Sequence, residues 1–213
     1  MRTEDLIEAL ARDTRPVAAR RVEQVTALAL IVGFGVSLAA TLIWLGPRPD
    51  MARAVHTGGF WLKMAYPLAV AIAAMSLGCA LVRPACPTRA RARWASAPFL
   101  IIFALGAVSF ALAPGADRAT IWWGHSWDLC PWYVLLFSLP PFVGVSLAFR
   151  QFAPTRLRLA GFVAGLSAGG VGAFAYAFSC NETGIPFLAA WFTLGILLAG
   201  GLGALLGPRI LRW

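Results

Sequence analysis

Two cysteines, Cys130 and Cys180, are the residues whose type and placement best fit reactive chemistry in this chain. Each lies at the boundary of a long apolar run, and neither lies in the middle of one. Two thiols at one depth could form a reversible disulfide, or bind a soft metal ion with help from His125, Asp128 or Glu182. A permanent structural disulfide is the alternative, because the sequence does not show how far apart the two sulfur atoms lie.

Six uncharged apolar runs must position these cysteines. The chain has 213 residues, of which 60% are hydrophobic and only 13% are charged, so it is too apolar for a domain with a water-facing surface. A hydrocarbon core about 30 Å thick needs roughly 20 helical residues to cross, and barrel strands would be shorter and alternating. The sequence therefore predicts an all-α integral membrane protein with six transmembrane helices. The runs are 25–45, 64–82, 97–113, 129–149, 159–178 and 185–207.

The distribution of the positive charges predicts the orientation of the helices. If the N-terminus is cytoplasmic, fourteen of the 18 cations fall on the cytoplasmic side, and the C-terminus lies there too because six is an even number. A net charge of +9 that is explained in this way indicates contact with membrane lipid and no direct binding of nucleic acid. The four cations predicted outside are Arg48, Arg53, Lys63 and Arg118.

Residues 1–23 form the only sizeable polar segment, and we expect it to be a cytoplasmic tail on a six-helix domain that spans 24–213. Leu6, Ile7 and Leu10 share one face of a short amphipathic helix that Thr3 can cap. Helices this short are marginal alone in water, which favours ordering on a partner or on the lipid surface. A loose tail that merely precedes the first span is the alternative.

Two of the runs carry features that predict their shape and packing. Pro140 and Pro141 must interrupt the hydrogen bonds of the fourth run and bend it near mid-membrane. In the fifth run, small residues repeat every four positions, which lets another helix approach closely within one chain or between two copies. The oligomeric state is therefore open at this stage. These small residues are Gly161, Gly165, Gly169, Ala173 and Ala177.

Several function classes lack the residues that they need. None of the six runs contains Asp, Glu, Lys, Arg or His, whereas ion-coupled transporters usually place such groups at mid-membrane. The sequence offers no phosphate loop, no His-x-x-x-His pair and no Ser-His-Asp set, so we expect no enzyme and no resident cofactor. A membrane thiol-disulfide oxidoreductase and a passive metal or small-solute permease are the alternatives, although the Cys-x-x-Cys pair typical of the former is absent.

A set of short segments spread over nearly the whole chain forms a recognisable combination. The segments are 2–13 with Pro16-Val17, Cys130 before Leu139-Pro140, Arg150 with Ala153-Pro154, 160–169, 176–180 and the terminal 211–213. This combination resembles the NrsF family, which are negative regulators of sigma factor F in proteobacteria. Members of that family are six-span inner-membrane anti-sigma factors. They hold an extracytoplasmic-function sigma factor inactive and release it under stress, including heavy-metal stress.

The resemblance implies roles for particular residues. It implies that Cys130 and Cys180 are a sensor pair on the periplasmic side. From the residues alone, the pair could form a disulfide or, with His125, bind a metal transiently. It also implies that the 1–23 tail contacts the sigma factor and that the protein lies in the bacterial inner membrane. The residues expected to contact the sigma factor are Leu6, Ile7 and Leu10.

Overall fold

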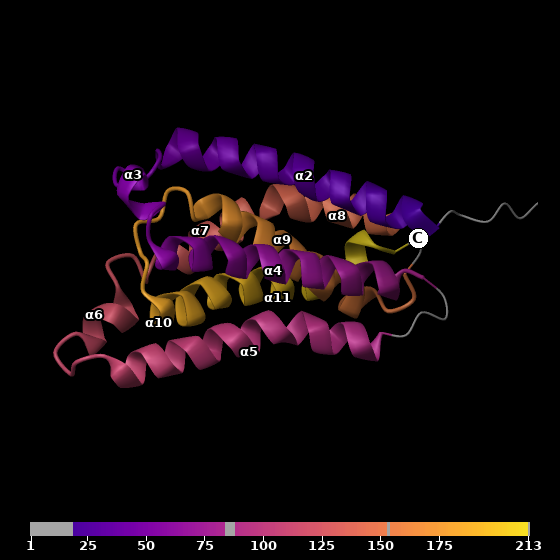
Figure 1. Ribbon diagram of the computed structural model, residues 1–213. Coiled ribbons are helices and arrows are strands. Elements are labelled where there is room, and N and C mark those ends of the chain that lie inside the picture. Colours follow the sequence, from indigo (N-terminus) through magenta and orange to yellow (C-terminus); the bar gives the residue numbers. More distant parts are fainter. Residues whose placement is uncertain (1–18, 84–87, 153, 213) are drawn as a thin grey trace, which may run out of the picture.

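The structure, a computed structural model, describes residues 19–83, 88–152 and 154–212 as a bundle of roughly parallel helices (Figure 1). All regular secondary structure in these residues is helical, which confirms the predicted all-α class. Five helices are long and apolar enough to cross a membrane, and a bent pair gives a sixth crossing if it counts as one span. The helices therefore fit the six predicted runs.

The helices follow the order of the runs along the chain. The long elements are α2 (Ala19–Trp44), α4 (Gly58–Leu81), α5 (Arg89–Leu112), the bent pair α7 (Cys130–Phe137) and α8 (Leu139–Arg150), α9 (Leu157–Tyr176), and α10 (Ile185–Phe187), which continues through the π-helix η1 (Leu188–Phe192) into α11 (Thr193–Ile210). The short helices α3 (Met51–Ala54) and α6 (Arg118–Trp123) lie in connecting segments.

Three helices begin more than one helical turn before the apolar runs that predict them. They are α2, which begins at Ala19, α4, which begins at Gly58, and α5, which begins at Arg89. A hydrogen-bonded helix does not have to end where its apolar residues end, so the first turns extend through polar and charged positions. The predicted 1–23 segment consequently runs into α2 at its end. Leu6, Ile7 and Leu10 lie outside the described residues.

Helix α9 forms the centre of the bundle, and 83% of the residues in its most apolar 18-residue stretch are buried. Glycines allow close approach on several of its sides. A Cβ added at Gly165 would meet the carbonyl oxygen of Ala199 on α11, one at Gly170 would meet α4, and one at Gly172 would meet the backbone at Ser138. The small-residue face predicted for this span thus packs against α11 within the same chain.

The predicted break in the fourth span lies at Ser138, where α7 and α8 meet at an angle of 40°. Pro140 and Pro141 follow immediately in the first turn of α8, where they supply no N–H group to the carbonyls one turn earlier. The prolines therefore bend the span and do not end the helical path across the bundle.

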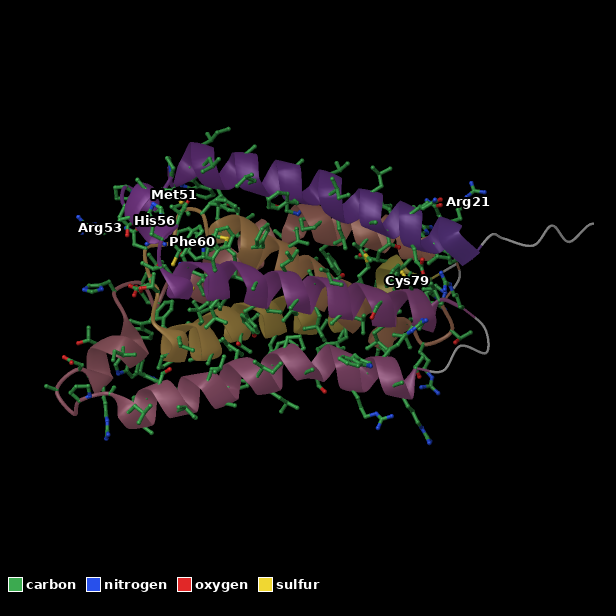
Figure 2. All side chains as sticks on the ribbon, viewed as in Figure 1. Arg21, Met51, Arg53, His56, Phe60 and Cys79 are labelled. Atoms are coloured by element: carbon green, nitrogen blue, oxygen red, sulfur yellow. The ribbon has the colours of Figure 1, made fainter. Side chains whose placement is uncertain are left out.

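The two ends of the bundle differ in the segments that they contain. Helices α3, α6 and α10 lie at one end, called the α3/α6 end below, whereas α2 begins and the chain finishes at the other (Figure 1). Arg53 and His56 lie at the α3/α6 end, and Arg21 and Cys79 lie at the opposite end (Figure 2). The described chain thus starts and finishes at the same end, as an even number of crossings requires.

Candidate functional site

The structure brings Cys130 and Cys180 into one buried site at the α3/α6 end. Cys130 is the first residue of α7, and Cys180 follows the end of α9 in the 177–184 connection. Their exposed fractions are 0% and 4%, and both belong to the same hydrophobic cluster. The two thiols lie close enough that a negative charge on one would act on the other, and both are free in this structure. Residues that lie 50 positions apart in the sequence therefore lie together in the core.

Aromatic side chains pack in the same cluster as this cysteine pair. The ring of Tyr176 lies 5.6 Å from that of Tyr133 and 5.8 Å from that of Phe192, centroid to centroid. Tyr176 and Phe192 belong to the buried cluster, and Tyr133 packs against it. The backbone N–H of Cys180 donates to the carbonyl of Tyr176 at 3.1 Å. Because both thiols are buried, a reagent can reach them only when the structure opens locally.

Lys63 on α4 is fully buried beside the pair, at the α3/α6 end, where Arg53, another predicted outer cation, also lies. Its Nζ donates to the carbonyl oxygen of Cys180 at 2.7 Å and to that of Glu182 at 2.6 Å. The same Nζ lies 5.2 Å from the ring centroid of Phe192 and interacts electrostatically with both thiols. Within the described part of the chain, no carboxylate forms an ion pair with Lys63.

Arg48 also contacts the 177–184 connection and is only 3% exposed. Its guanidinium donates two hydrogen bonds to Asp50, at 2.7 and 2.8 Å, and one to the carbonyl of Asn181 at 3.5 Å. Its backbone N–H donates to the carbonyl of Phe178 at 3.1 Å. The hydrogen bonds from Arg48 lower the pKa of Asp50. Arg48 therefore fixes the chain on both sides of Cys180.

His125 does not join the two cysteines. Its backbone N–H donates to Oε1 of Glu182 at 2.6 Å, and its Nδ1 lies 3.5 Å from the same oxygen, but its side chain is 88% exposed. Gly124, with a φ of +56°, allows this approach, because a Cβ there would meet the Glu182 carboxylate. Across residues 19–83, 88–152 and 154–212, no group of three or more His, Cys, Asp or Glu residues could hold a metal ion. Metal binding by Cys130, Cys180 and His125 stays a prediction.

Comparison with known proteins identifies the family. The family model described as negative regulator of sigma F, NrsF, matches residues 10–213. The chain belongs to the NrsF family. Similar proteins include the probable anti-sigma-F factor NrsF of Azospira oryzae and the anti-sigma-F factor NrsF of Caulobacter vibrioides. Each is 36% identical over 220 residues that cover all of both chains. No solved structure matches.

The NrsF match covers the whole of the cysteine site and only part of the predicted partner-binding face. Cys130, Cys180 and Lys63 all lie within residues 10–213, whereas Leu6 and Ile7 precede that range. Membership in NrsF confirms the family resemblance and indicates a regulatory rather than a catalytic role.

Sequence reasoning missed Lys63 and Arg48 as parts of this site. One signal was present: Lys63 is the only lysine of the chain and stands between Leu62 and Met64, with no other charged residue near it. A lone cation in apolar surroundings is costly to bury unless polar groups compensate it, so it marks a position with a specific partner. The partner could not be predicted, because the two carbonyls that accept from Lys63 lie more than a hundred residues away.

Proposed function

We propose that this chain is an anti-sigma factor that holds an extracytoplasmic-function sigma factor inactive at the bacterial inner membrane. The observation that carries this proposal is the full-length similarity to two anti-sigma-F factors, together with the family match over 10–213. The apolar helices support a membrane location, since five or six of them are long enough to cross. The cytoplasmic tail, through Leu6, Ile7 and Leu10, would cover a sigma-factor surface that core polymerase needs.

Cys130 and Cys180 would sense the stress that releases the sigma factor. Their burial in one cluster at the end opposite the start of α2 supports this role, because an orientation with the positive charges inside would put that end in the periplasm. Oxidation would join the two sulfur atoms and pass two electrons and two protons to the oxidant. A soft metal ion would instead replace the two thiol protons.

The cysteine site and the cytoplasmic tail would lie at opposite ends of the bundle. Either reaction must therefore change how the helices between them pack. Cys130 begins α7 and Cys180 follows α9, and both helices run from the cysteine site toward the bend at Ser138. A change in the separation of the sulfur atoms would therefore displace α7 relative to α9. Transmission requires two packings of similar free energy, and the bent α7–α8 span is the element that we expect to differ between them.

A pull-down of tagged protein from bacterial membranes under reducing, metal-free conditions tests the anti-sigma function. Since α2 begins at Ala19, a version that lacks residues 1–18 leaves the described helix intact. We expect the full-length chain to retain a sigma factor, and we expect this deletion and a Leu6→Ala/Ile7→Ala/Leu10→Ala variant to lose it.

A Glu4→Ala/Glu8→Ala variant of the same tail is the matched control, and it should retain the sigma factor. Retention by the version without residues 1–18 would show that the tail is not the contact. If none of the versions retained a sigma factor, the proposed function would be wrong.

A further inference from the structure

The environment of the Lys63 ammonium is unusual for a buried charge. It is completely inaccessible to solvent, and its partners are two carbonyl oxygens and the face of an aromatic ring. Burying an ammonium is costly even when hydrogen bonds compensate it partly. A methionine of similar length could fill the same space without that cost, so the charge must be explained by what it contacts.

Both carbonyls that Lys63 contacts belong to the short segment that carries the second cysteine. One is the carbonyl of Cys180 itself, at 2.7 Å from Nζ, and the other is that of Glu182, at 2.6 Å. Cys180 cannot move away from Cys130 unless these hydrogen bonds break or the Lys63 side chain moves with it. Hydrogen bonds to a charged donor are stronger than neutral ones, so they restrain the segment effectively.

We propose that Lys63 is a positioning residue of the cysteine site, which ties residues 180–182 to α4 and thereby sets the placement and accessibility of both thiols. Its importance for stress sensing rests on the proposed function, whereas its effect on the thiols does not. The ammonium also interacts electrostatically with both cysteines. In surroundings of low polarity it attracts negative charge that develops on sulfur during oxidation or metal binding.

The competing explanation is that Lys63 stabilises the whole fold. The reactivity of Cys79 distinguishes the two explanations. Cys79 is 2% exposed and lies on α4 as Lys63 does, but at the opposite end of the helix (Figure 2). Global unfolding exposes all three buried thiols together. Local release of residues 180–182 exposes Cys180 and its neighbour Cys130 while Cys79 stays protected.

The experiment measures the alkylation rate of each thiol by N-ethylmaleimide in the folded full-length protein, by mass spectrometry, in a Cys86→Ser background. We expect Lys63→Met, which keeps the length of the stem and removes the charge, to accelerate alkylation at Cys180 and Cys130 by about tenfold or more. The rate at Cys79 should stay unchanged. Lys63→Arg, which keeps the charge, should restore slow alkylation.

Thr41→Val is the matched control, because Thr41 is also fully buried and its hydroxyl donates only to the carbonyl of Ser37 in its own helix. It should leave all three rates unchanged. If Lys63→Met fails to fold, Lys63→Gln, which keeps one neutral donor, should give a smaller acceleration confined to Cys180 and Cys130. Equal acceleration at all three thiols, or none at Cys180, would overturn the proposal.

This test needs no sigma factor, so its outcome is independent of the proposed function. Selective exposure of Cys180 in a protein that retains no sigma factor would leave the role of Lys63 intact and remove the anti-sigma function. Retention of a sigma factor without selective exposure of Cys180 would leave the anti-sigma function intact and remove the role of Lys63.

Discussion

The hydroxyl of Ser37 on α2 donates a hydrogen bond to the carbonyl oxygen of Phe137 at 2.7 Å, deep in the bundle. In a regular helix the N–H four residues later would donate to that carbonyl, but the residue there is Pro141, which has none. A neighbouring helix therefore supplies the missing donor at the bend between α7 and α8. This is how a span interrupted by proline keeps its polar groups satisfied inside a membrane.

Ser37→Ala should leave the Phe137 carbonyl without a donor and reduce the free energy of unfolding by about 1 kcal/mol. Unfolding in mixed micelles, monitored by circular dichroism, measures the change. Pro141→Ala restores an N–H in the right register, so the serine substitution should cost clearly less in that background. The same cost in both backgrounds would show that the hydroxyl does not replace the missing helical donor.

Gly165→Ala should destabilise the bundle by about 1–3 kcal/mol, because its Cβ would meet the carbonyl oxygen of Ala199 and force α9 and α11 apart. Gly201→Ala on α11 is the matched control, since a Cβ there meets nothing within 4 Å. Helix propensity should make that control neutral or stabilising by up to about 1 kcal/mol. The same unfolding assay compares the two variants, and similar losses would contradict the packing described for α9.

The sequence was sufficient to predict the helical class, the approximate spans and the bend at Pro140-Pro141. Each follows from a local property, either an uncharged run of sufficient length or a residue without an N–H group. The first turns of α2, α4 and α5 were missed because charged residues end an apolar run without ending a helix. The sequence could not decide whether the Gly161 to Ala177 face packs within one chain or between two copies, because a small-residue face admits a helix of the same chain as readily as one of a second copy.

Within the candidate site, the sequence identified the cysteines but not the residues that hold them. Cys130 and Cys180 could be paired because both lie at boundaries of apolar runs. Arg48 and Lys63 stand between two predicted apolar runs, 25–45 and 64–82, where a cation is ordinarily solvated. Their burial depends on carbonyl groups of the 177–184 connection, and backbone acceptors leave no signature in a sequence.

Asp50→Asn should lower the melting temperature, because Arg48 would remain buried without its countercharge. Pairing with Arg48 lowers the pKa of Asp50 below the ordinary value of 3.8. The contribution of this pair is therefore fully present at neutral pH and is lost as the pH falls through the lowered pKa. Melting temperatures of the wild type and the Asp50→Asn variant should differ at pH 7 and converge in strong acid. The control is Asp117→Asn, which replaces an exposed acid at the start of α6 and should leave the melting temperature unchanged at both pH values.

Oxidation by diamide should join Cys130 to Cys180 within one chain and leave Cys79 free, because the first two share one cluster and Cys79 lies at the other end of α4. Peptide mapping by mass spectrometry in the Cys86→Ser background identifies the bridge. Bridging that involves Cys79, or crosslinks only between chains, would contradict the arrangement of the site.

The role of the cysteine pair can be tested by measuring sigma-factor release from membranes that carry the preformed complex, after treatment with cadmium ions or with diamide. The wild-type chain should release the sigma factor under both treatments, whereas a Cys130→Ser/Cys180→Ser variant should retain it. A Cys79→Ser variant should behave as the wild type does. Equal release from the wild type and the double variant would show that this cysteine pair at the α3/α6 end does not control sigma-factor release.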